Sequence, residues 1–169
     1  AIVTGGRRGI GLAIALELAG RGYDLALTGV GADATSADAI ARLEALGAAA
    51  DFIVSDLSDI SSHASAVARV LERFGRIDCL VNNAGIGAPV RGDFLDLEPA
   101  NFDLVLATNL RGTVFFTQAV LRAMVRNPAG PSPRAIVNIT SVSAESASPE
   151  RLDYCMSKAA ASMFPKGLA

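Results

Sequence analysis

A glycine-rich stretch near the start of the chain, TGGRRGIG at residues 4–11, constrains the fold more than any other feature. It follows a short apolar run typical of a buried strand and precedes a run with the apolar spacing of a helix. In such a strand–turn–helix unit, Gly5 permits a tight turn, Gly9 lets the backbone approach a phosphate, and Gly11 permits close helix packing. For the glycines alone, a plain strand-to-helix turn remains the alternative.

The rest of the chain alternates short apolar runs with longer runs of helical period, which is typical of a parallel sheet. We predict strands at residues 1–4, 24–28, 49–54, 77–82 and 135–140. The predicted helices begin near residue 10, cover residues 40–46, 67–74 and 99–125, and follow residue 149, with a loop at residues 128–133. The prediction is one α/β domain over residues 1–169, a doubly wound parallel sheet of Rossmann-like type in α/β/α layers with right-handed crossovers.

Composition excludes several classes of function. The 169 residues carry 51% hydrophobic side chains, enough for a full core, and a net charge of −2 with both signs scattered, which indicates no nucleic-acid partner. We find no apolar run near the ~18 residues that a membrane span needs. The chain has one histidine, His63, and two cysteines, Cys79 and Cys155, which is too few for a metal site and favours a cytoplasmic location. We predict that His63 lies at the surface where a helix starts and that Cys155 packs in the interior.

Further motifs follow the later strands at informative positions. NNAG at residues 82–85 follows the fourth strand, Ser141 follows the fifth, and Asn109 lies in the long predicted helix. YCMSK at residues 154–158 places a tyrosine four residues before a lysine, so the two side chains share a helix face. Combined with the GxxxGxG spacing, these motifs resemble the short-chain dehydrogenase/reductase family, most of all bacterial 3-oxoacyl-(acyl-carrier-protein) reductases.

The resemblance implies an oxidoreductase that reduces a ketone, 3-oxoacyl or other, to a secondary alcohol by hydride transfer. It implies that Tyr154 acts as the general acid, Ser141 hydrogen-bonds the carbonyl oxygen, Lys158 assists the tyrosine and holds the ribose, and Asn109 positions a water. The residues implied to bind the cofactor are Thr4, Gly5, Arg7, Arg8, Gly9, Ile10, Gly11, Asp56, Leu57, Asn83, Ala84, Gly85, Tyr154 and Lys158.

Several of these assignments have alternatives. Only the offset from Tyr154 distinguishes Ser141 from Ser143, Ser146 and Ser148, and Asn109 could instead cap or kink its helix. Of the two asparagines of NNAG, the second is expected at the cofactor, and the first, Asn82, is expected to tie neighbouring strands together.

The sequence favours NADP(H) over NAD(H). An NAD-dependent enzyme commonly has an acid at the end of the second strand, where it binds the ribose 2′-hydroxyl. Residues 28–30 are Thr, Gly and Val, and Asp33 falls after the position that the family uses. Arg7 and Arg8 lie in the glycine loop, and Arg8, directly before Gly9, resembles the family's clamp for a 2′-phosphate. The alternative is that these arginines only make an exposed loop soluble.

The first residues already read as strand, and the family's members run on through two more strands and a substrate loop after the last helix, so we expect the native chain to be longer at both ends. Without those strands, the fifth strand would be an exposed apolar edge, and Pro165 would stop the last helix. The expected partners are a small-molecule or acyl-carrier carbonyl substrate and, as in the family, a second copy in a homodimer or homotetramer. Two alternatives are a nucleotide-binding module without turnover and an NAD-dependent enzyme for a sugar or alcohol; a flavodoxin-like signalling domain does not fit the glycine spacing or YxxxK.

Overall fold

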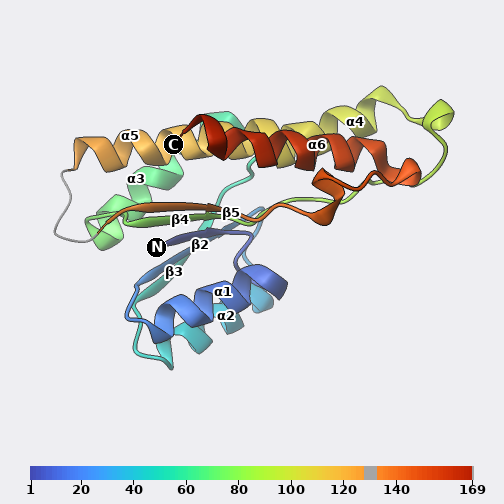
Figure 1. Ribbon diagram of the computed structural model, residues 1–169. Helices are drawn as coiled ribbons and strands as arrows, with labels where there is room; N and C mark the ends of the chain where they lie inside the picture. The colour runs from blue at the N-terminus through green and yellow to red at the C-terminus, as the bar shows by residue number, and fades with distance from the viewer. Residues whose placement is uncertain (128–132, 169) are drawn as a thin grey trace.

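A parallel five-stranded sheet organises the chain, seen in a computed structural model that describes residues 1–127 and 133–168 (Figure 1). The sheet order is β3-β2-β1-β4-β5, and every strand pair in it is parallel. The strands are β1 (Ile2–Thr4), β2 (Leu25–Gly29), β3 (Ala50–Val54), β4 (Cys79–Asn82) and β5 (Ala135–Asn138). All five predicted strands are confirmed, with ends that differ by two residues or fewer.

Helices cover both faces of the sheet, which confirms the predicted layers (Figure 1). One face carries α1 (Gly9–Gly20) and α2 (Ala34–Glu44). The other carries α3 (His63–Phe74), α5 (Thr113–Arg126) and α6 (Leu152–Met163), with α4 (Pro99–Leu106) beside α6. Parallel strands joined by helices bring the carboxyl ends of β1, β2, β3 and β4 to one edge, where loops can build a site.

Two apolar cores hold the layers together, one on each face. Successive residues of a strand point to opposite faces, so Ile2 lies in the core beneath α3 and α5, whereas Val3 lies in the core over α1 and α2. Phe116 is fully buried in the first core and Leu43 in the second. The central strands β1, β2 and β4 are therefore buried on both faces, which explains why they read as continuous apolar runs rather than alternating ones.

The long predicted helix forms, but it is not uniform. Pro99 occupies its first turn, and a π-helical segment, Ala107–Gly112, joins α4 to α5. By length and apolar composition the combined helix Pro99–Arg126 could cross a membrane, contrary to the expectation that no segment would qualify. Its inner face packs on the sheet and on α3, and core helices of α/β proteins meet the same criterion.

Some local predictions need correction. His63 begins α3 as predicted but is only 2% exposed, because its ring packs edge-on against Phe116 at 5.3 Å and its Nε2 contacts the Leu57 carbonyl oxygen at 3.1 Å. Leu46 lies beyond the end of α2 and is exposed, because α2 ends at Glu44. The predicted loop at residues 128–133 lies outside the described residues except for its last position.

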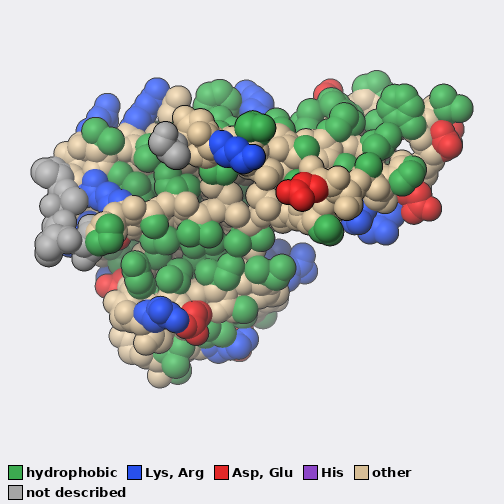
Figure 2. All heavy atoms as spheres, in the orientation of Figure 1, with side chains coloured by type: hydrophobic (Ala, Val, Ile, Leu, Met, Phe, Trp, Pro, Cys, Tyr) green, Lys and Arg blue, Asp and Glu red, His purple; other side chains and the backbone are tan. Residues whose placement is uncertain are grey.

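The exposed sheet edge was predicted correctly. β5 pairs only with β4 among the described strands, and Val137 is 43% exposed. Figure 2 shows hydrophobic side chains gathered between the two helical layers on the side where β5 lies. Helix α6 ends at Met163, and Pro165 follows in a 3-10 turn, as the missing proline N–H requires.

Candidate active site

A groove of about 380 Å³ opens at the carboxyl edge of the sheet, between the ends of β1, β2, β3 and β4. Its walls combine the glycine loop, the end of β2, the turn after β3 and the NNAG segment. The residues that line it are Gly5, Arg7, Arg8, Gly9, Ile10, Gly11, Thr28, Gly29, Val30, Ser55, Asp56, Leu57, Asn83, Ala84, Gly85, Ile86 and Thr108. The structure thus brings together eleven of the fourteen residues predicted to bind a cofactor; Thr4, Tyr154 and Lys158 lie outside this lining.

The glycines of the loop are required by geometry. Gly5 and Gly9 have φ values of +64° and +56°, a region that L residues rarely adopt. Gly11 has no positive φ, but a Cβ on it would lie 2.5 Å from Asn83 Nδ2 and 2.6 Å from the Gly5 carbonyl oxygen. Gly11 therefore allows the first turn of α1 to pack against the NNAG segment.

The N-terminus of α1 faces the groove without a side-chain cap. Arg8 occupies the N-cap position and makes no capping hydrogen bond, so the first N–H groups of the helix keep their donor capacity. Free N–H groups and the positive end of the helix dipole form an anion site, and a diphosphate suits it. The groove residues therefore fit a dinucleotide.

Thr4 lies beneath the groove and holds two of its walls together by hydrogen bonds. It is fully buried, and its Oγ1 accepts hydrogen bonds from the backbone N–H groups of Asn83 and Ala84, each at 3.0 Å. Asn83 Nδ2 in turn donates to the Thr4 carbonyl oxygen at 2.9 Å and to the Gly5 carbonyl oxygen at 3.3 Å. These bonds fix the NNAG segment on the glycine loop, so Thr4 shapes the groove without lining it.

The other asparagine of this motif has the predicted structural role. Asn82 Nδ2 donates to Asn138 Oδ1 on the neighbouring strand at 2.9 Å and to Thr117 Oγ1 on α5 at 2.8 Å. It ties β4 to β5 and to the helical layer, as expected.

Asn109 lies in the π-helical segment and is 3% exposed. Its Oδ1 accepts from the Ile86 N–H at 2.8 Å, and its Nδ2 donates to the Ile86 carbonyl oxygen at 2.8 Å and to Ser157 Oγ at 3.0 Å. Ser157 Oγ donates onward to the Tyr154 carbonyl oxygen at 2.7 Å. Sequence reasoning missed Ser157, although its position three residues after Tyr154 places it on the same face of α6.

Lys158 and Tyr154 lie together on α6. Lys158 is 7% exposed, its Nζ donates to the Ile139 carbonyl oxygen at 3.1 Å, and burial lowers the pKa of this amine. Its Nζ is 5.9 Å from the centre of the Tyr154 ring, and the Arg151 guanidinium carbon is 5.5 Å from the same centre. Two cationic side chains therefore lie close to the Tyr154 ring.

Gly85 lies between the groove and the side chains of Asn109 and Lys158. A Cβ on Gly85 would lie 3.1 Å from Asn109 Oδ1 and 3.5 Å from Lys158 Nζ, and Gly85 also lines the groove. Lys158 and Asn109, the lysine and asparagine predicted to be catalytic, therefore lie at one end of the groove, with Gly85 between them and the groove.

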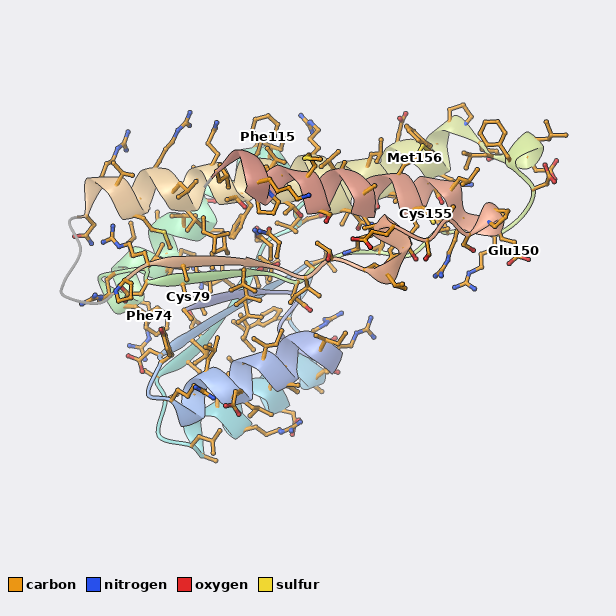
Figure 3. The ribbon with its side chains drawn as sticks, in the orientation of Figure 1. Phe74, Cys79, Phe115, Glu150, Cys155 and Met156 are labelled. Atoms are coloured by element: carbon orange, nitrogen blue, oxygen red, sulfur yellow. The ribbon has the colours of Figure 1, made fainter. Side chains whose placement is uncertain are left out.

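Ser141 begins the segment that packs on α6. Its Oγ accepts from the Ser143 N–H at 3.1 Å and caps the 3-10 turn Val142–Ala144, which contacts α6. Ser143, the nearest alternative, is the buried residue of this turn. Cys155, labelled on α6 in Figure 3, is buried as predicted. Its Sγ lies against the backbone of Ser148.

Arg7 and Arg8 differ in their surroundings. Arg7 Nη1 donates to Asp33 Oδ2 at 2.8 Å and to the Gly31 carbonyl oxygen at 2.9 Å. Arg8 is exposed, and it has no ion pair with any described residue. No side chain projects at Gly29, the end of β2, where a Cβ would lie 3.0 Å from the Phe52 ring.

Comparisons with known proteins agree on one family. The sequence profile of the family described as short chain dehydrogenase matches residues 1–169. Sepiapterin reductase from Chlorobaculum tepidum is 40% identical over 163 residues, which cover 93% of this chain and 64% of that protein.

Solved structures give the same result. A 3-oxoacyl-[acyl-carrier protein] reductase from Brucella melitensis, in complex with NAD, is 54% identical with a TM-score of 0.95, covering 99% of this chain and 65% of that one. A short chain dehydrogenase from Burkholderia cenocepacia, in complex with NADP, is 37% identical with a TM-score of 0.88, again covering 99% and 65%. The chain therefore spans slightly less than two thirds of the length of these relatives.

Proposed function

Because the chain belongs to the short chain dehydrogenase family, we propose that it is an NADP(H)-dependent oxidoreductase that reduces a ketone to a secondary alcohol. The observation that carries this proposal is the junction at Gly85, where the groove suited to a dinucleotide meets the buried Asn109 and Lys158. A nucleotide whose diphosphate lies on α1 would extend along the groove toward this junction. The reacting end of the cofactor would then lie beside Tyr154.

The residues divide the chemistry among them. When bound, the nicotinamide supplies hydride to the carbonyl carbon. The Tyr154 hydroxyl gives its proton to the carbonyl oxygen, and Ser141 Oγ donates a hydrogen bond to the same oxygen. Lys158 has three donor hydrogens and uses one on the Ile139 carbonyl, so others can bind the ribose. The positive charges beside the ring stabilise the negative charge that the proton transfer leaves on Tyr154.

Asn109 is held rigidly enough to position a water for proton return. Its side chain makes three hydrogen bonds, two of them to Ile86, and its Oδ1 lies against Gly85 at the end of the groove. An acceptor fixed in this way can orient a water that carries protons from solvent toward the tyrosine.

The electrostatics of the groove support NADP(H). No acid stands at the end of β2, where Phe52 leaves no room beside Gly29, and Arg8, which has no ion-pair partner among the described residues, lines the groove. A guanidinium binds a phosphate dianion more strongly than it binds a ribose hydroxyl. The structure with NAD at 54% identity is the observation that favours NAD(H) as the second candidate.

We also propose a substrate class, an assembly and a location. The substrate is a 3-oxoacyl thioester or another ketone, consistent with the reductases among the relatives. Phe115 on α5 and Met156 on α6 are exposed apolar side chains on helices of the outer layer (Figure 3), which suits packing against a second copy in a homodimer or homotetramer. The two cysteines are free and buried, as in a reducing cytoplasm.

The test is ketone-dependent oxidation of NADPH with a 3-oxoacyl thioester and simple ketones as substrates. Tyr154→Phe should lower turnover by about 10²–10⁴-fold, because the general acid is lost, while NADPH binding persists. The chain has one other tyrosine, so Tyr23→Phe is the matched control and should keep full activity. Turnover by Tyr154→Phe at the control rate would overturn the mechanism, and binding without turnover in every case would indicate a non-catalytic module.

A further inference from the structure

The ion pair between Arg7 and Asp33 connects two loops at the mouth of the groove. Arg7 belongs to the glycine loop, and Asp33 caps α2 after the end of β2. The Arg7 side chain is 22% exposed and lines the groove, whereas Asp33 lies outside the groove lining. The guanidinium therefore links the Asp33 carboxylate, whose side chain is 49% exposed, to the wall of the groove.

Both carboxylate oxygens of Asp33 are engaged. Oδ2 accepts from Arg7, and Oδ1 accepts from the Ser36 N–H at 3.0 Å in a capping box that Ser36 Oγ completes. Each oxygen keeps a further lone pair and the side chain is 49% exposed, so the pair limits the Asp33 carboxylate by balancing its charge rather than by blocking its acceptors. The second contact of Arg7, to the Gly31 carbonyl oxygen, further fixes the guanidinium on the β2–α2 loop.

Resting on the proposed function, we propose that the Arg7–Asp33 pair determines cofactor specificity by neutralising the Asp33 carboxylate beside the nucleotide groove. The pair has no net charge, so its attraction for a 2′-phosphate is much weaker than that of an unpaired arginine. Arg8, without an ion-pair partner among the described residues, then supplies the positive charge that a 2′-phosphate needs. Arg7 in this account neutralises an acid; it does not bind the phosphate.

The account predicts opposite effects for the two members of the pair. Arg7→Met leaves an unpaired carboxylate near the groove, which repels a phosphate and is free to bind a ribose hydroxyl. Asp33→Asn keeps an oxygen that can cap α2 but releases Arg7, which adds positive charge at the groove. One unit charge at roughly 5–8 Å in a largely aqueous site changes affinity by about three- to tenfold, and added salt should reduce the effect.

The experiment measures dissociation constants for NADPH and NADH by nicotinamide fluorescence, with adenosine 2′,5′-bisphosphate and adenosine 5′-phosphate as competing probes. The preference for NADPH should fall about three- to tenfold in Arg7→Met and rise by a similar factor in Asp33→Asn. The double variant, which again has no net charge at the pair, should return to the wild-type preference. Ser36→Ala weakens the capping box without changing charge and should leave the preference unchanged.

The outcomes separate this inference from the proposed function. If the wild-type protein binds neither nucleotide, both are overturned. If it binds a nucleotide but Asp33→Asn leaves the preference unchanged, only the role of the pair is wrong. A double variant that stays as weak for NADPH as Arg7→Met would show that Arg7 binds the phosphate directly, which also contradicts the inference.

Discussion

Replacing Gly11 by alanine tests whether the glycine loop is built on close packing. The new Cβ would lie 2.5 Å from Asn83 Nδ2 and 2.6 Å from the Gly5 carbonyl oxygen, and real Cβ contacts essentially never fall below 3.0 Å. The glycine loop or the NNAG segment must therefore move by about 0.5 Å. Overpacking of this kind costs about 1–3 kcal/mol, and for a domain of this size each kcal/mol lowers Tm by about 2–4 °C. We expect Gly11→Ala to lower Tm by about 2–12 °C.

Gly20 offers the matched control in the same helix. Apart from the backbone of its own helix, a Cβ on Gly20 would meet no heavy atom within 4 Å, and Gly20 has no positive φ. Gly20→Ala should therefore leave Tm unchanged or raise it slightly. Thermal unfolding and NADPH titration of both variants make the comparison, and only Gly11→Ala should weaken binding, because Gly5 and Asn83 both line the groove. Equal Tm values and equal affinities for the two variants would refute the packing argument.

Three further predictions concern stability. Burial lowers the pKa of His63, so the unfolded chain takes up the proton first as the pH falls. The contribution of His63 to the free energy of unfolding is therefore fully present above about pH 6.5 and declines below it. Urea unfolding at two pH values should show a steeper decline in the wild type than in His63→Gln. Ser157→Ala leaves Asn109 Nδ2 without its second acceptor and should cost about 1–3 kcal/mol in urea unfolding; no loss would mean that this bond contributes nothing. Phe116→Ala should cost about 3–5 kcal/mol because the ring is fully buried, whereas Phe115→Ala, at a side chain 39% exposed, should cost clearly less; similar losses in calorimetry would contradict the assignment of the core.

The sequence predicted the strands and the groove well because both depend on local patterns. Apolar runs bounded by polar or glycine residues mark β1 and β4, and the glycine loop has the same conformational demands in any chain that uses it. Motif spacing also singled out Asn109 and Lys158, which lie on helical segments and come together beside Gly85 at one end of the groove.

The features that sequence reasoning missed depend on contacts between distant segments. His63 looks like a polar residue at a helix start, and only its packing against Phe116 shows that it is buried. The Arg7–Asp33 pair joins residues 26 positions apart through the conformation of two loops, which no spacing rule describes. The π-helical segment that carries Asn109 reads as an ordinary helix, because its apolar spacing differs little from that of α4 and α5.

The central claim is that the groove and the Tyr154–Lys158 pair form one active site. A crystal structure of the protein with NADP⁺ tests this directly. The account predicts that the diphosphate lies on the N-terminus of α1, that the 2′-phosphate contacts Arg8, and that the nicotinamide lies past Gly85 beside Tyr154. A nucleotide bound elsewhere, or one in the groove with its nicotinamide far from Tyr154, would contradict it.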